Sequence, residues 1–201
     1  PMPRHHHSSG CSIVNGTLTR FMPAWSCTLR EPSTRLPSET VTTAFSTGAD
    51  ASITEFNYDR TVELARETAA KNGWTLVQDT SWPGYEEIPL RIMQGYLTMT
   101  LETAEQLGGK KPTHVFLQAG VGSMPAAAAA FFANLYGAER PIVTIVESNQ
   151  ADCIYRTAAA RDGKIHAVNG DMRTIMAGLA CGVPGMTFSQ ASMPMRLAGL
   201  C

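Results

Sequence analysis

A glycine-containing loop between a predicted strand and a predicted helix has residue types that suit ligand binding. Residues 117–125 read Leu-Gln-Ala-Gly-Val-Gly-Ser-Met-Pro. Glycine lets backbone amides turn toward a ligand without a Cβ in the way, and a helix start adds N–H groups and a positive dipole end. The segment therefore predicts a phosphate cradle, although a tight turn without a ligand explains it equally well. The cradle residues are Gly120, Val121, Gly122, Ser123 and Met124.

Two phosphate-bearing ligands compete for this loop, a dinucleotide and pyridoxal phosphate. A dinucleotide fingerprint requires G-x-G-x-x-G/A and an acidic residue at the end of the next strand. Pro125 stands at the third glycine position, which does not fit. Glu147 does end the next predicted strand, but it lies farther from Gly120 than the usual spacing of about 20 residues. The dinucleotide match is therefore partial.

Asp79 is the second candidate, because it follows a predicted strand at residues 74–78. Ligands in open α/β sheets bind outside the carboxyl ends of the strands. A carboxylate there acts as a general base when burial raises its pKa. The alternative is that Asp79 only caps the turn at Thr80 and Ser81. Three further acids are interpreted as turn or cap residues, and they are Glu147, Asp152 and Asp171.

Strands and helices alternate along the chain, with connections too long for hairpins. This pattern predicts an α/β fold with a parallel sheet and helices on both faces. The predicted strands are 51–56, 74–78, 114–118, 142–146 and 166–168. The predicted helices are 58–72, 88–107, 125–136, 151–160 and 174–180. Residues 26–47 show no apolar period and are expected to be irregular.

The composition excludes several classes of protein. The chain has 201 residues, 44% hydrophobic and 16% charged, with a net charge of −1. This balance gives no reason to expect nucleic acid or membrane binding, and we identify no secretory signal. The five cysteines are odd in number and form no CxxC, so neither a zinc site nor a disulfide framework is predicted. We expect no metal at the histidines 5–7 and a cytoplasmic setting.

Six segments, in order along the chain, carry a resemblance to one enzyme family. They are residues 56–62 (FNYDRTV), 77–85 (VQDTSWPGY), 92–96 (IMQGY), 112–122 (PTHVFLQAGVG), 151–156 (ADCIYR) and 170–182 (GDMRTIMAGLACG). Together they resemble the diaminopropionate ammonia-lyases, which are fold-type-II pyridoxal-phosphate enzymes related to the tryptophan synthase β-subunit. The resemblance favours pyridoxal phosphate at residues 120–124.

The resemblance implies the activity and the role of Asp79. The family's reaction is α,β-elimination of 2,3-diaminopropionate, an amino-acid substrate, to pyruvate and ammonia. Asp79 matches a family active-site aspartate. Family members are usually homodimers. Cys153 and Cys181 each flank a predicted helix, in segments that the family packs together, so we expect them to lie close in space.

The sequence also departs from the family. The family's cofactor-binding lysine lies in a segment resembling NAFKMLGG, which this chain does not contain, and its DGNHG and STEGDTD segments are likewise absent. We therefore expect a partial chain, inactive by itself. Residues 1–48 are expected to be irregular or outside the family, residues 49–185 to form an incomplete cofactor-binding domain, and residues 186–201 to be a divergent tail. A non-catalytic remnant and a dinucleotide-binding oxidoreductase domain are the alternatives.

Overall fold

The structure is a computed structural model that describes residues 10–14, 17–21, 25–30, 49–54, 56–186 and 196–200, with side chains described for residues 54 and 56–186. Contacts divide the chain into two units, Pro1–Gln78 and Asp79–Cys201. Each unit is described by itself. Among the described residues, no helix combines the length and the apolar character needed to cross a membrane.

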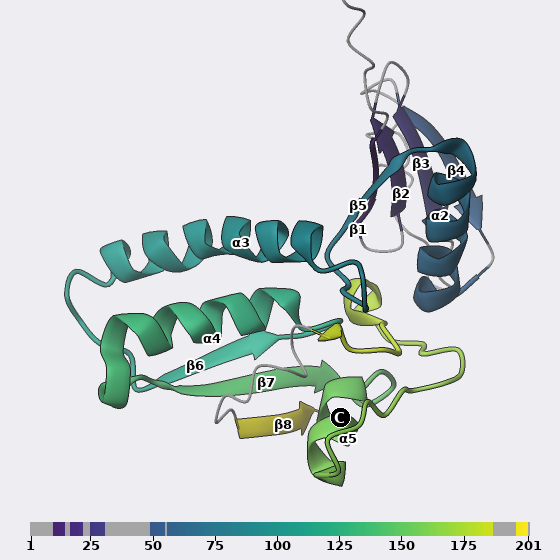
Figure 1. Ribbon diagram of the computed structural model, residues 1–201. Coiled ribbons are helices and arrows are strands. Elements are labelled where there is room, and N and C mark those ends of the chain that lie inside the picture. Colours follow the sequence, from purple (N-terminus) through teal and green to yellow (C-terminus); the bar gives the residue numbers. More distant parts are fainter. Residues whose placement is uncertain are drawn as a thin grey trace, which may run out of the picture. The chain divides into compact units, whose positions relative to one another are not determined.

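The first unit contains a five-stranded sheet and helix α2 (Figure 1). The strand order is β4-β3-β2-β1-β5. The strands are β1 (Gly10–Val14), β2 (Thr17–Phe21), β3 (Trp25–Arg30), β4 (Ala49–Thr54) and β5 (Thr75–Gln78). β1 and β5 pair in parallel, as do β3 and β4, whereas β2 is antiparallel to both of its neighbours. The sheet of this unit is therefore mixed.

Helix α2 (Tyr58–Asn72) has the bounds that the sequence predicts. The side chain of Asn57 accepts a hydrogen bond from the Arg60 N–H at 2.9 Å, which caps the first turn. Gly73 ends the helix in the left-handed region with φ 66°. The predicted apolar face is buried, and it consists of Val62, Ala65 and Ala69.

Three strands lie in residues 1–48, the segment expected to be irregular or outside the family. β3 begins at Trp25 and overlaps the start of residues 26–47, which show no apolar period. The strands are only five or six residues long. β1 and β3 also pair with strands farther along the chain, β5 and β4, and a search for periodicity does not detect such pairing. Residues 31–48 and the histidines at 5–7 lie outside the described residues.

The second unit contains a parallel sheet, which confirms the predicted α/β organisation. Its strands are β6 (His114–Gln118), β7 (Ile142–Ser148) and β8 (Arg196–Leu200), in that order. Helix α3 (Glu87–Gln106) packs against α4 (Ser123–Tyr136), which runs beside the sheet (Figure 1). The 3-10 turn η1 (Gly137–Glu139) follows α4, and α5 (Cys153–Ala160) follows β7. The core between these elements includes Ala126, Ala129, Val143, Ile145 and Ile154.

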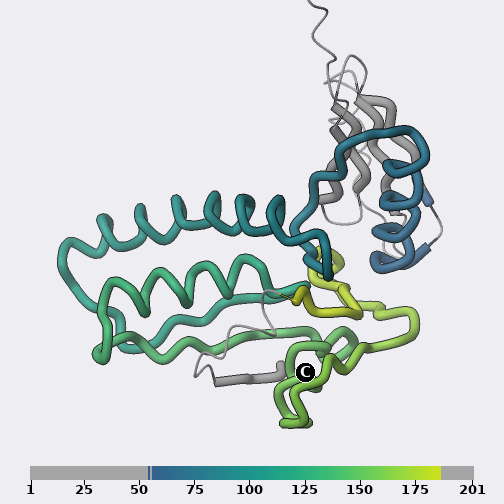
Figure 2. The backbone as a smooth tube through the Cα atoms, in the orientation of Figure 1, coloured from purple at the N-terminus to yellow at the C-terminus, as the bar shows by residue number. Residues whose placement is uncertain are grey.

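Several predicted elements of this unit differ from the structure. Residues 166–168 form no strand, and residues 174–180 contain only the 3-10 turn η2 (Ala177–Leu179). The Val168 N–H donates to the Gly182 carbonyl at 2.8 Å, which is the backbone of a distant loop rather than of a neighbouring strand. The local backbone bonds of residues 176–180 join residues three apart, as in a single 3-10 turn. Figure 2 shows the segment after α5 running back toward the start of α4 without a helix. Strand β8 lies in the expected divergent tail.

Candidate active site

The predicted phosphate loop joins the end of β6 to the first turn of α4. The Ala119 N–H donates to the Val146 carbonyl at 3.0 Å, which extends the pairing of β6 with β7 to the start of the loop. Gly122 then adopts φ 96° and is the N-cap residue of α4. The helix begins at Ser123, two residues before the predicted start at Pro125. Only glycine adopts this backbone conformation without strain, which explains its presence.

The carbonyl groups of the loop are directed into the protein. The Val121 carbonyl accepts a hydrogen bond from the Gly185 N–H at 2.8 Å. The Gly120 carbonyl oxygen lies 3.9 Å from Cys153 Sγ. A Cβ on Gly120 would stand 3.0 Å from Cys181 Sγ, so a larger residue would crowd that thiol. The fold therefore holds the loop backbone closely at Gly120 and Val121.

Cys153 and Cys181 are both buried and both lie beside Gly120. The closeness of their two Cα atoms, which a bridge would require to be within about 7 Å, stays a prediction. The contacts with Gly120 place one thiol on α5 and the other in the segment after η2. These two segments thus meet at the loop, as the resemblance implies.

A phosphate fits this loop through the backbone. Because Gly122 has no side chain, the N-cap residue supplies no acceptor for the N–H groups of Ser123 and Met124, which lie at the positive end of α4. Pro125 carries no N–H, and the Ala126 N–H donates to the Gly122 carbonyl at 3.0 Å. The N–H groups of Ser123 and Met124 fit the predicted cradle, and the assignment of residues 120–124 as a whole stays a prediction. Their buried walls include Val121 and Ser123.

Asp79 lies at the same end of α4. The Ser123 hydroxyl, on the first residue of the helix, donates a hydrogen bond to the Asp79 carboxylate. The following turn is also tied to this region, because the Met186 N–H donates to the Ser81 carbonyl at 3.2 Å while the adjacent Gly185 binds Val121. Sequence reasoning selected Asp79 and Ser123 separately, and the structure brings them together.

Tyr96 is a site residue that the sequence did not reveal. It lies on α3, and its phenol is half-buried. Burial raises the pKa of Tyr96, and the Asp79 charge and hydrogen bond raise it further. No sequence signal links these residues, because the contact depends on the packing of α3 against α4.

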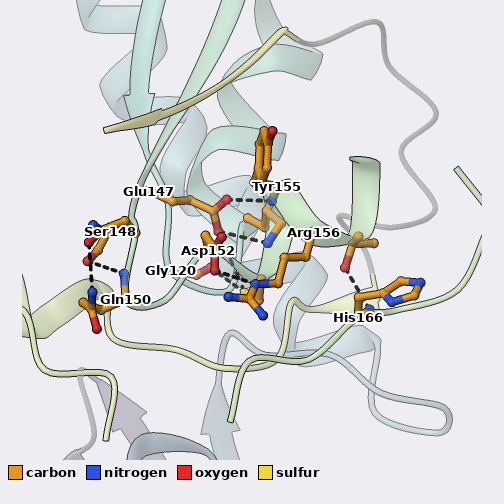
Figure 3. Close-up of polar contacts among 12 residues, drawn as sticks. Gly120, Glu147, Ser148, Gln150, Asp152, Tyr155, Arg156 and His166 are labelled. Carbon is orange, nitrogen blue, oxygen red and sulfur yellow. Dashed lines mark hydrogen bonds and ion pairs between the residues drawn. The ribbon is translucent and has the colours of Figure 1, made fainter. Parts of the chain in front are cut away.

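Glu147 has a structural role at the end of β7, as expected for a cap residue. It is 2% exposed, and its two carboxylate oxygens accept hydrogen bonds from the Ile154 N–H at 2.9 Å and the Tyr155 N–H at 2.7 Å (Figure 3). Both donors belong to the first turn of α5. Glu147 is the carboxylate that would bind the ribose of a dinucleotide, and both of its oxygens already accept hydrogen bonds from the backbone of α5. Asp152 precedes α5 and pairs with Arg156 at 2.8 Å, whereas Asp171 is largely exposed.

Burial raises the pKa of Glu147 to about 7, although the Ile154 and Tyr155 N–H groups oppose the shift. Because the folded pKa exceeds the ordinary value of 4.5, the folded protein binds a proton that the unfolded chain releases between about pH 4.5 and 7. Stability is therefore lost as the pH rises through this window. A shift of this size corresponds to an upper value of about 3 kcal/mol.

We expect Glu147→Gln to remove this part of the pH dependence. The wild-type free energy of unfolding should fall by about 2 kcal/mol more than that of the variant between pH 5 and pH 7.5. Denaturant unfolding at the two pH values measures the difference. Glu139→Gln is the control, since the hydrogen bond with Lys111 holds the pKa of the Glu139 carboxyl below its usual value, outside this window. Equal slopes for wild type and Glu147→Gln would contradict the assignment.

The lysines of this chain lie on the protein surface. The four lysines are all exposed, and they are Lys71, Lys110, Lys111 and Lys164. Lys111 pairs with Glu139. Within the part of the chain that the structure describes, no three His, Cys, Asp or Glu side chains gather in a way that could hold a metal ion.

Comparison with known proteins defines the class to which this fold and loop belong. A family model described as "Pyridoxal-phosphate dependent enzyme" matches residues 11–195. The chain therefore belongs to the pyridoxal-phosphate dependent enzyme family. The match extends on both sides beyond the motifs quoted above.

Particular relatives are diaminopropionate ammonia-lyases. The chain is 49% identical to that of Salmonella typhimurium over 142 residues, which is 69% of this chain and 35% of the relative. It is 47% identical to that of Escherichia coli K12 over 148 residues, 73% of this chain and 37% of the relative. The structure of the holo Escherichia coli enzyme superposes with a TM-score of 0.71 and 41% identity, over 81% of this chain and 40% of that one.

A threonine deaminase from Solanum lycopersicum, 21% identical with a TM-score of 0.67, shows the same fold. The fold-type-II expectation is therefore confirmed. The chain spans little more than a third of the length of the curated relatives it matches.

Proposed function

We propose that this chain provides the phosphate loop and one acid–base residue of an enzyme that eliminates ammonia from 2,3-diaminopropionate, giving pyruvate and ammonia. The backbone amides of residues 120–124 would hold the phosphate of pyridoxal phosphate. When bound, this cofactor withdraws electrons from the α-carbon of an amino acid. The observation that supports the proposal is the hydrogen bond from Ser123, the first residue of α4, to the Asp79 carboxylate.

This hydrogen bond matters because it joins the two halves of the proposed site. Ser123 belongs to the loop that would hold the phosphate, and its side chain orients Asp79. A carboxylate placed there is within reach of a ligand anchored at the same helix end. Asp79 would take the proton from the substrate α-carbon or return one to the leaving group. The resemblance to the lyases supports the same role.

The proposal is tested by proton exchange rather than by complete turnover. Purified chain, pyridoxal phosphate and 2,3-diaminopropionate are incubated in D₂O, and loss of the α-proton signal is followed by NMR. We expect the chain to accelerate exchange over pyridoxal phosphate alone and Asp79→Asn to lower this acceleration by about a hundredfold. Cofactor affinity should stay equal or rise in the variant, because a negative charge beside a phosphate is removed.

Asp171→Asn is the matched control, since Asp171 is exposed and its nearest cation, Arg173, is 3.8 Å away. It should exchange like wild type. If Asp79→Asn also exchanges like wild type, or if the chain gives no acceleration, Asp79 is not the acid–base residue. A homodimer and a cytoplasmic setting remain part of this proposal; the lyase resemblance supports the first and the cysteine pattern the second.

A further inference from the structure

Two adjacent backbone N–H groups, which we call the strap, bridge the phosphate loop and the residues that follow Asp79. The Gly185 N–H donates to the Val121 carbonyl at 2.8 Å, and the Met186 N–H donates to the Ser81 carbonyl at 3.2 Å. Val121 belongs to the phosphate loop, whereas Ser81 ends what we call the Asp79 segment, residues 79–81. One short piece of chain thus bonds both parts of the proposed site.

Gly185 lies between these two parts, with room for little more than a methyl group. Its φ lies outside the left-handed region, so its backbone conformation does not require glycine. A Cβ added there would stand 3.4 Å from Ser81 Oγ, 3.4 Å from the Val121 carbonyl oxygen and 3.5 Å from the Ser81 nitrogen. A larger side chain therefore needs the two parts to separate. Space, rather than backbone conformation, accounts for glycine at this position.

We propose that Gly185 is a positioning residue: because it lacks a side chain, it keeps the Asp79 segment within bonding distance of the phosphate loop. This inference rests on the proposed function and deepens it, since it names a residue outside the six segments that carry the family resemblance. Gly185 acts on Asp79 through Ser81 and not on the reacting atoms. The hydrogen bond from Ser123 to the Asp79 carboxylate joins the same two parts through side chains.

The strap supplies a backbone connection that the Ser123 side chain does not. A phosphate in the loop and the Asp79 carboxylate are both negative, so they repel each other. The Ser123 hydroxyl follows the carboxylate when its side chain changes rotamer, whereas the strap joins backbone to backbone. The strap therefore holds the Asp79 segment beside the loop when the loop is occupied.

A larger side chain at Gly185 is expected to displace the Asp79 segment rather than the loop. The loop is fixed on one side by the bond from Ala119 to β7 and on the other by α4, which begins at Ser123. The Asp79 segment instead leads into an exposed turn at Gly84. Gly185→Val should therefore break the bond from the strap to this segment and leave the phosphate loop in place.

The first test follows the backbone amides of the full chain by hydrogen exchange, without cofactor. We expect the Met186 amide to exchange about tenfold faster in Gly185→Val than in wild type, because its bond to the Ser81 carbonyl opens. Gly95→Val is the matched control, since Gly95 on α3 also has a φ outside the left-handed region, with no atom within 4 Å of an added Cβ. Equal exchange of the Met186 amide in wild type and Gly185→Val overturns the proposal.

The second test combines the proton-exchange assay with the affinity for inorganic phosphate. Gly185→Val should slow exchange of the substrate α-proton by about tenfold, as expected when an acid–base residue is displaced, while its phosphate affinity equals that of wild type. A matching loss of phosphate affinity would show that residue 185 shapes the loop alone, which overturns the proposal. Slow proton exchange in Asp79→Asn with fast exchange in Gly185→Val overturns the role of Gly185 alone. Fast exchange in Asp79→Asn overturns the proposed function itself, and the role of Gly185 with it.

A smaller substitution applies if Gly185→Val does not fold. Gly185→Ala adds only the Cβ and should change Met186 amide exchange and α-proton exchange in the same directions, by about threefold. Ser81→Ala in the same chain removes Oγ, one of the contacted atoms, and should return both measurements toward wild type. Wild-type behaviour of Gly185→Ala, or a defect that Ser81→Ala leaves unchanged, overturns the proposal.

Discussion

The 201-residue chain by itself should release no pyruvate from 2,3-diaminopropionate, even with saturating pyridoxal phosphate. The resemblance to the lyases implies a lysine that holds the cofactor and moves protons afterwards. None of the four lysines of this chain lies in such a context, and all four are exposed. Loss of this group removes catalysis rather than reducing it, so the expected effect is large.

Pyruvate release, followed by a coupled assay, measures this prediction. The Escherichia coli lyase is the positive control under the same conditions. Turnover by the chain that disappears after Lys→Ala replacement at one of the four positions would show that the lysine was misassigned. Turnover that survives all four replacements would show that the reaction proceeds without a lysine of this chain.

Gly122→Val should weaken binding of pyridoxal phosphate by about tenfold or more. Gly122 adopts φ 96° at the N-cap of α4, and a β-branched residue resists this conformation and blocks close approach of a ligand to the backbone. Strain of about 1–2 kcal/mol would shift the loop away from its native backbone. The dissociation constant, measured by cofactor fluorescence, reports the loss.

Backbone strain alone is controlled by Gly163→Val. Gly163 has φ 71° in an exposed turn with no atom within 4 Å of an added Cβ. Valine at this position carries a similar conformational penalty but lies outside the loop. The affinity of Gly163→Val for pyridoxal phosphate should therefore match that of wild type. Equal weakening by both variants would mean that general destabilisation, rather than the loop, controls binding.

The elements that local signals define were predictable from the sequence. Helix α2 begins after a capping asparagine, Asn57, and ends at Gly73 in the left-handed region, so both ends are encoded within a few residues of the boundary. The apolar strand β6 and the glycine at the end of α4 are similarly local. The loop at residues 120–124 was found because a strand, two glycines and a helix follow each other directly.

Strands that depend on distant partners were not predictable by the same reasoning. β1 pairs with β5 more than 60 residues later in the chain, and β8 joins β7 from within the expected tail. One signal was available: Asn15-Gly16 stands between β1 and β2, where Val14 pairs with Thr17, and Asn-Gly between two short apolar runs is a strong hairpin signal. The remaining pairings follow from tertiary contacts.

Two residues of the candidate site were predictable from local sequence, and a third was not. Asp79 and Ser123 stood out individually, because one follows a strand and the other begins a helix. Tyr96 did not, since its place on the apolar stripe of α3 predicts only packing. The effect of Asp79 on the pKa of Tyr96 depends on the tertiary packing of α3 against α4 (Figure 1).

The central claim is that the backbone of residues 120–124 binds the phosphate of pyridoxal phosphate. Amide hydrogen exchange of the full chain, measured with and without ligand, tests it most directly. Pyridoxal phosphate should slow exchange at these amides, inorganic phosphate should do so at higher concentration, and pyridoxal without its phosphate should not. Equal exchange at residues 120–124 with and without pyridoxal phosphate, or equal protection by pyridoxal, would contradict the assignment of the loop as a phosphate cradle.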